Sequence, residues 1–355
     1  MAKAAKGKYV AYVGTYTYET SKGIHIYDLD EKSGRLTEKK VVPINNPSDL
    51  IISNNGKYLY SIADEGVRSF KIMPDGDLEE INGKWTGGMR GCYLDIDDEG
   101  RYLFVGSYHD GRISMMKLNP EDGSIVGVAD GVFHKGVGRN ISDRSSRPHI
   151  NCVKLTPDQH YVCAVDGGLD NMKVYKIDYE NGKLNMIDIV RSDIDTAPRM
   201  IRFSKNGKFA YVLNELSNTI DAYKYYEDER GPEFERIQTV VTDLNNDERE
   251  CTALDIELSA DGKYLYASND DMNSVIIYKI DNTTGLLEMV SLSKISGEFP
   301  KSIAILPDGK HFLCACHDTN TINNFVVNYD DGYVLMDSAP VKVEMPNCIF
   351  IHKLD

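Results

Sequence analysis

The chain has 355 residues, of which 41% are hydrophobic and 27% are charged. This length and composition permit a large buried core and exclude a disordered or low-complexity protein. The 55 Asp and Glu residues outnumber the 40 Lys and Arg residues and give a formal charge of −15, which argues against a surface that binds nucleic acid.

Neither the start of the chain nor its cysteines indicate export or a membrane. The basic segment Met1 to Lys8 lacks the apolar run of a secretory signal, and no later stretch approaches the roughly 18 apolar residues of a spanning helix. The seven cysteines are scattered and include no C-x-x-C pair. We therefore expect a cytoplasmic protein with reduced thiols, no membrane partner, no metal and no cofactor.

Along the chain, one short pattern recurs seven times. It consists of a tight turn, an aromatic residue in most copies, and an alternating apolar strand, as in residues 206–215 (NGKFAYVLNE) and 261–270 (DGKYLYASND). Asn-Gly and Asp-Gly readily supply the positive φ that tight hairpins require. The copies begin at Lys6, Asn55, Glu99, Asp158, Asn206, Asp261 and Asp308.

A second turn recurs in phase with the first, between the end of one strand and the start of the next. Seven repeats in 355 residues give about 51 residues each, the size of a propeller blade with four antiparallel strands. No long stretch keeps a helical period, so α/β folds are disfavoured. The second turns centre on Gly34, Gly76, Gly123, Gly182 and Gly285, with less regular copies at Gly231 and Gly332.

Each repeat is expected to begin with an inner strand just before its first turn. Six such strands are predicted, at residues 49–53, 93–97, 151–156, 200–204, 254–259 and 302–306. The missing seventh is supplied by residues 346–352, which we expect to join the N-terminal blade and close the ring. The prediction is an all-β, seven-bladed propeller over residues 8–355, preceded by a tail at residues 1–7.

In a propeller, the starts of the inner strands and the ends of the second strands meet at one face, around the mouth of the central channel. Among the charged groups predicted there, His149, Arg199 and Glu215 could serve as general base, oxyanion or carboxylate anchor, and orienting acid. A structural ring of ion pairs is the alternative. Other predicted substrate-binding positions at the mouth are Arg90, Glu65, Asp166, Asp255, Lys301 and His317.

The loop before His149 is cationic in an otherwise acidic chain. Lys135, Arg139, Arg144 and Arg147 outnumber its single acid, Asp143. Arginine binds phosphate and carboxylate well, so Arg139 and Arg147 are candidates for holding an anionic small molecule. A solvated loop without a ligand is the alternative reading.

Several of these segments resemble, in order and spacing, the lactonase family of seven-bladed propellers, which includes propeller-type 6-phosphogluconolactonases and the fungal carboxy-muconate lactonizing enzyme. The likeness runs over essentially the whole chain from about Lys8. It rests on residues 12–17 (YVGTYT), 23–27 (GIHIY), 147–149 (RPH), 166–170 (DGGLD), 197–199 (APR) and 213–215 (LNE).

The resemblance implies a hydrolase that adds water to a sugar lactone, most simply 6-phosphogluconolactone. It assigns catalytic roles to His149, Arg199 and Glu215. A cycloisomerase of the carboxy-muconate type and a non-enzymatic propeller that binds a ligand or a protein are the alternatives. Sequence leaves the oligomeric state open.

The chain departs from the family pattern at the predicted mouth. Asp270 stands where family members commonly carry an arginine, and Tyr93 and Asn151 stand where many carry histidines. Lys301 replaces an arginine of the sixth inner strand. These changes remove positive charge and imidazoles, so a neutral lactone or a different ring is also possible.

Overall fold

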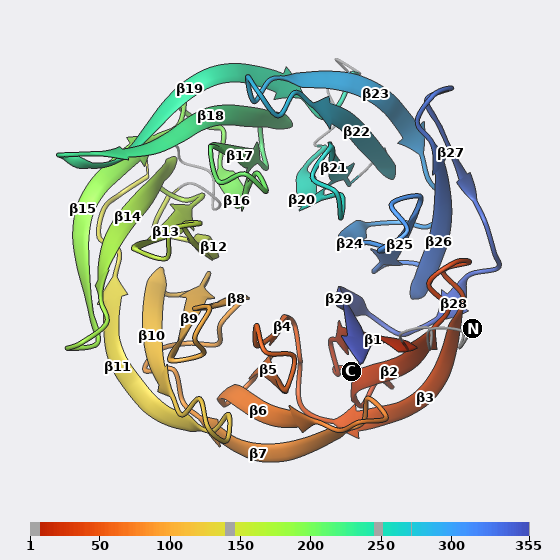
Figure 1. Ribbon diagram of the computed structural model, residues 1–355, viewed down its shortest axis with the longest axis horizontal. Helices are drawn as coiled ribbons and strands as arrows, with labels where there is room; N and C mark the ends of the chain where they lie inside the picture. Colours follow the sequence, from red (N-terminus) through yellow and green to blue (C-terminus); the bar gives the residue numbers. More distant parts are fainter. Residues whose placement is uncertain (1–7, 139–145, 245–250, 271, 355) are drawn as a thin grey trace, which may run out of the picture.

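The computed structural model describes residues 8–138, 146–244, 251–270 and 272–354. Within these ranges the chain forms strands and no helix, and it therefore contains no helix able to cross a membrane. The strands build seven antiparallel sheets arranged around a central axis (Figure 1). The predicted all-β, seven-bladed propeller is confirmed. The predicted tail at residues 1–7 lies outside the described residues.

The strands of the first four sheets follow the expected order. They are β1 (Lys8–Thr15), β2 (Gly23–Leu29), β3 (Leu36–Pro43), β4 (Leu50–Ile52), β5 (Tyr58–Ala63), β6 (Gly66–Ile72), β7 (Leu78–Lys84), β8 (Tyr93–Ile96), β9 (Tyr102–Ser107), β10 (Arg112–Leu118), β11 (Ile125–Phe133), β12 (Ile150–Leu155), β13 (Tyr161–Asp166), β14 (Asn171–Asp178) and β15 (Lys183–Arg191).

The remaining three sheets repeat this order, and the last gains an extra strand. Their strands are β16 (Pro198–Phe203), β17 (Phe209–Asn214), β18 (Thr219–Asp228), β19 (Gly231–Val241), β20 (Ala253–Leu258), β21 (Tyr264–Asn269), β22 (Ser274–Ile280), β23 (Leu287–Lys294), β24 (Pro300–Ile305), β25 (His311–Cys316), β26 (Thr321–Asn328), β27 (Tyr333–Met336) and β28 (Val341–Lys342). The last strand of the chain, β29 (Pro346–Leu354), belongs to the first sheet. β28 pairs with β26 beside β27.

The C-terminal strand closes the ring as predicted. β29 lies innermost in the first sheet, in the order β29-β1-β2-β3. It pairs antiparallel with β1 from Lys8 opposite Leu354 to Thr15 opposite Pro346. Figure 1 shows the first and last segments of the chain side by side in this blade. The two ends of the chain therefore share one sheet, which joins the first and last blades.

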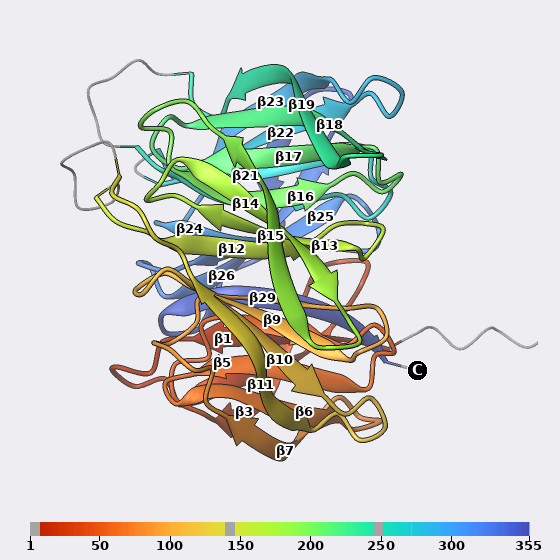
Figure 2. The same ribbon diagram turned by 90° about the vertical axis from the view of Figure 1, so that its left-hand side faces the viewer.

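The second strand of each blade carries the core because neighbouring blades cover both of its faces. Every residue of β5, β9, β13 and β17 is buried. Burial on both faces explains why these strands are apolar almost throughout. Figure 2 shows the same ribbon from the side, where the strands of successive blades lie beside one another.

The two turn markers recur in phase because they touch across blades. The Tyr60 hydroxyl, on β5, donates a hydrogen bond to the carbonyl of Gly123 in the next blade, at 3.1 Å. Tyr12 donates to Gly76 and Tyr211 to Gly285 in the same way, at 2.9 and 3.2 Å. One repeat therefore recognises the next through a buried tyrosine and a glycine turn.

Candidate active site

A cavity of about 630 Å³ lies on the axis of the ring. The inner strands of several blades border it, together with the loops at their starts. These inner strands begin and end within about two residues of the predicted positions. The charged and aromatic groups that line the cavity near its mouth include Tyr16, Arg90, His109, Arg199, Glu215, Asp270, Phe299 and Lys301.

Arg199 and Glu215 meet in this cavity. Arg199 lies at the start of β16, Glu215 directly follows β17, and the Arg199 Nη1 atom is 2.7 Å from Glu215 Oε2. Arg199 Nε also donates to the Leu254 carbonyl at 2.7 Å. The side chains are only 24% and 12% exposed, so the pair is shielded and the guanidinium plane is held by two bonds.

Lys301 is a partly buried cation with no ion-pair partner among the described residues. No carboxylate lies within ion-pair distance of its Nζ atom among the residues that the structure describes, and the ammonium instead faces the rings of Tyr16 at 4.6 Å and Phe299 at 5.9 Å. Burial, and next the charge of Arg199, lower the pKa of Lys301 to about 7. An unpaired ammonium that is partly removed from water is costly, and an anionic ligand in the cavity would relieve that cost.

Arg90 adds a further positive charge at the mouth. Its Nη1 atom lies 3.1 Å from Asp64 Oδ1 and donates to the Tyr18 hydroxyl at the same distance. Its guanidinium carbon lies 5.3 Å from the centre of the Tyr16 ring. The side chain of Arg90 thus remains in the cavity while one carboxylate balances its charge.

His149 does not line the cavity. Its side chain is buried, with the residue 2% exposed, and its ring stacks on Tyr108 at 4.2 Å. Its Nδ1–H donates to the Tyr108 carbonyl at 2.8 Å. Because Tyr108 stands between this imidazole and the cavity, the geometry does not suit the general base that the sequence predicted.

Asp166 holds a loop rather than facing the cavity. Its carboxylate is fully buried, accepts the backbone N–H of His149 at 2.9 Å and lies 2.6 Å from the Nδ1 atom of His134. His134 and His149 flank the cationic loop, so a single carboxylate ties both of its ends. Asp166, which the sequence predicted to bind substrate, therefore holds the two ends of this loop.

Asp255 is also engaged in the framework. Its Oδ2 atom accepts the N–H of Ile303 in the next blade at 2.7 Å, and Asp49 and Asp95 accept from Leu94 and Leu155 in the same way. Asp255 borders the cavity, and burial raises its pKa to about 6. Its main contact is a bond that joins neighbouring blades.

Three further predicted binding positions, among the described residues, lie outside the cavity lining. Glu65 is exposed and lies 3.8 Å from Arg68. Arg147 is exposed and outside the cavity lining, and Arg139 lies outside the described residues. The Nδ1–H of His317 donates to the Pro346 carbonyl at 3.1 Å, and its ring packs on Tyr16 and Phe299, which places it behind the aromatic pair that faces Lys301.

Tyr93, which stands where many family members carry a histidine, contacts Arg202 deeper in the channel. The Arg202 Nη1 atom donates to the Tyr93 hydroxyl at 2.8 Å, and Arg202 Nε is 3.1 Å from Glu257 Oε2. These side chains border the cavity below its mouth. The Tyr93 hydroxyl thus accepts a hydrogen bond from the Arg202 guanidinium, which is largely removed from water.

Sequence reasoning missed His109. This residue follows Tyr108 after β9 and lines the cavity with its side chain. Burial, followed by the positive charges of Arg90, His149 and Arg147, lowers its pKa below the ordinary value. The ends of the second strands were expected at the mouth, and His109 lies two residues after the end of β9.

Comparison with known proteins identifies the family. A family model described as lactonase, 7-bladed β-propeller matches residues 10–351. The chain belongs to this family. A Bacillus subtilis protein named 6-phosphogluconolactonase is 29% identical to it over 356 residues, covering 98% of this chain and 99% of the relative.

Two further proteins are similar to this chain over most of its length. An uncharacterized protein of Staphylococcus saprophyticus is 33% identical over 310 residues, covering 86% of this chain and 87% of its own. The structure of a periplasmic gluconolactonase from Pseudomonas aeruginosa superimposes with a TM-score of 0.91 at 25% identity, over 98% of this chain and all of that one. The family resemblance drawn from the sequence is confirmed.

Proposed function

We propose that the protein hydrolyses a sugar lactone that carries an anionic group, with 6-phosphogluconolactone as the first substrate to test. One observation carries the anionic preference: the Lys301 ammonium lies in the cavity with Arg199 and without an acidic partner of its own among the described residues. The name of the Bacillus subtilis relative supports the same substrate.

The proposed reaction begins with water attacking the lactone carbonyl carbon. His109 takes the proton of that water, since its lowered pKa keeps the imidazole neutral near pH 7. Arg199 stabilises the oxyanion as it forms, and Glu215 keeps the guanidinium in place through the 2.7 Å contact. The ring C–O bond then breaks, and His109 returns the proton to the departing oxygen.

His149 has a positioning role in this proposal. Its Nδ1–H bond to the Tyr108 carbonyl and its stacking on the Tyr108 ring hold the segment that presents His109. Arg199 and Glu215 keep the roles predicted from the sequence, whereas the role of base passes from His149 to His109.

The first experiment measures acid release from a panel of phosphorylated and unphosphorylated sugar lactones. We expect Arg199→Ala and His109→Asn each to reduce kcat by about 100-fold or more. His311→Asn serves as the control, because His311 begins β25 next to the β24–β25 turn and does not line the cavity. Saturable binding detected by thermal shift without any turnover would instead establish a binding propeller.

The split between the two histidines is a second test. If His109 is the base, His109→Asn removes the ionisation on the acid limb of the kcat/KM profile, whereas His149→Asn retains that ionisation. If the acid limb is lost only in His149→Asn, then His149 is the general base, as first expected from the sequence.

The cytoplasmic location remains part of the proposal. All seven cysteines are free thiols, which suits a reducing compartment, although the Pseudomonas neighbour is named periplasmic. Immunodetection in fractionated cells decides between the two compartments.

A further inference from the structure

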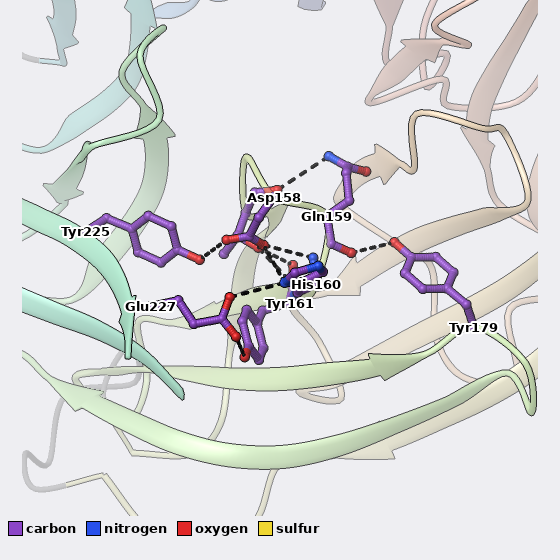
Figure 3. A network of polar contacts seen from close by, with 8 residues as sticks. Asp158, Gln159, His160, Tyr161, Tyr179, Tyr225 and Glu227 are labelled. Atoms are coloured by element: carbon purple, nitrogen blue, oxygen red, sulfur yellow. Dashed lines mark hydrogen bonds and ion pairs between the residues drawn. The ribbon is translucent and has the colours of Figure 1, made fainter. Parts of the chain in front are cut away.

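A cluster of polar side chains lies on the face of the propeller away from the cavity mouth. It surrounds the turn between β12 and β13 and receives Glu227 from β18 of the neighbouring blade (Figure 3). Asp158 and His160 come from the turn itself. Neither the cavity nor the proposed reaction involves this cluster.

Three potential ligand atoms converge there. His160 Nδ1 is 3.2 Å from Glu227 Oε2 and 3.9 Å from Asp158 Oδ1, and all three ligand atoms lie within 4.8 Å of one another. Around a tetrahedral zinc ion with bonds of about 2.0–2.1 Å, neighbouring ligand atoms are about 3.4 Å apart. Asp158 Oδ1 is held by the Thr156 hydroxyl at 2.7 Å and the backbone N–H of His160 at 2.8 Å. Rotations of the His160 and Glu227 side chains, which are 60% and 40% exposed, would bring the three atoms to that spacing.

Two tyrosines hold the carboxylates from behind. The Tyr161 hydroxyl donates to Glu227 Oε1 at 2.6 Å, and the Tyr225 hydroxyl donates to Asp158 Oδ2 at 2.5 Å. Each tyrosine occupies the oxygen other than the one that faces His160 (Figure 3). Outer hydrogen bonds of this kind orient ligands in metal sites.

The internal repeat supplies an independent observation. At the position of His160, the six other copies of the repeat carry a lysine or arginine, whose charge repels a metal ion. His160 instead offers an imidazole nitrogen, and Gln159 occupies the preceding position with a φ of 63° where those six copies have glycine. The six basic residues are Lys8, Lys57, Arg101, Lys208, Lys263 and Lys310.

We propose that Asp158, His160 and Glu227 bind a divalent transition-metal ion, such as zinc, and so connect two neighbouring blades. One nitrogen and two carboxylate oxygens suit zinc, and water completes its coordination at this exposed site. Sequence spacing did not reveal the site, because Glu227 is contributed by a different blade from the other two ligands.

The test uses zinc chloride with chelator-treated full-length protein. We expect zinc to bind in isothermal titration and to raise the Tm of the wild type. His160→Lys inserts a residue found at this position in other blades and places an ammonium beside Glu227, while Glu227→Gln retains an acceptor for Tyr161. Each should fold and bind zinc at this site at least tenfold more weakly.

A matched control is available at the corresponding turn of the last blade. His311 lies 2.6 Å from Asp308 through Nδ1 and 3.9 Å from Asp337 through Nε2, so its partners approach opposite nitrogens. His311→Lys should leave zinc binding unchanged. Wild-type zinc affinity in folded His160→Lys, or no zinc binding by the wild type, would overturn the proposal. An anomalous zinc peak bonded to His160 Nδ1 would locate the ion directly.

Discussion

Lys301 couples the charge of the cavity to pH in the physiological range. Its ammonium is faced by Arg199, Arg90, His317, Asp318 and Cys348, and the nearest rings belong to Tyr16 and Phe299. With a pKa lowered to about 7, it is charged below that pH and neutral above it. A single residue can therefore strengthen or weaken the attraction for an anion.

The preference for a phosphorylated over an unphosphorylated lactone should fall as pH rises from 6.5 to 8.5. We expect the ratio of their kcat/KM values to drop by about tenfold in the wild type, equivalent to ~1.4 kcal/mol. Lys301→Arg retains its charge over this range and should keep the ratio constant. A wild-type ratio that does not change with pH would show that Lys301 does not contact the anion.

Asp49 is a buried acid whose ionisation opposes folding. Burial raises its pKa to about 8 from an ordinary value of 3.8, although it accepts the Leu94 N–H. The folded protein thus keeps a proton on Asp49 that the unfolded chain loses above about pH 4. The stability that this proton contributes is present at acid pH and is lost progressively as pH rises toward 8.

Asp49→Asn should remove this pH dependence, because an amide does not ionise. Its oxygen can still accept the Leu94 N–H. We expect the Tm difference, variant minus wild type, to increase by at least about 2 °C between pH 5 and pH 8. Differential scanning calorimetry across this range provides the measurement. A constant Tm difference would mean that Asp49 ionises normally in the folded protein.

At the scale of the element, the glycine turns between the third and fourth strands join neighbouring blades. Gly123 has a φ of 73°, and a Cβ atom built there would lie 2.3 Å from the Tyr58 ring. The same turn accepts the hydroxyl bond of Tyr60. Its backbone conformation and its contact with the adjacent blade thus require glycine for separate reasons.

Gly123→Ala should be more destabilising than an alanine at a glycine with the same backbone conformation and open surroundings. Gly100 is the matched control, since its φ is 66° and nothing lies within 4 Å of the added Cβ. We expect Gly100→Ala to cost about 1 kcal/mol and Gly123→Ala a further 1–3 kcal/mol or so from overpacking. Urea unfolding measures both, and equal losses would refute the packing argument.

For the whole molecule, β29 determines whether the seven sheets form a closed ring. It supplies the innermost strand of the first blade and packs against β24 and β25 of the last. Residues Asn347 to Ile351 also border the cavity. Closure of the ring and completion of the cavity therefore depend on the same strand.

A chain truncated after residue 345 should lose cooperative thermal unfolding and precipitate, because β1 and the last blade would both be left open. A synthetic peptide of residues 346–354 added in trans should partly restore a cooperative transition. Circular dichroism during heating distinguishes the cases. A truncated chain with the wild-type Tm would show that closure by β29 is dispensable.

Some of the residues predicted to lie at the mouth line the cavity, and others pack against neighbouring residues instead. Arg199, Glu215, Arg90 and Lys301 do line the cavity, whereas His149 lies behind Tyr108. Strand order predicts the height of a residue along the axis. It does not predict whether a side chain turns toward the channel or toward the adjoining blade, which is a matter of packing.

The sequence by itself determined the number of blades, their inner strands and the closing strand, because these depend on local turn chemistry and on strand alternation that repeats about every 51 residues. Only the tertiary structure decided that Asp166 and Asp255 serve the framework, that His109 reaches the cavity and that His160 faces Glu227. Those outcomes depend on contacts between blades, which bring together residues that no local pattern connects.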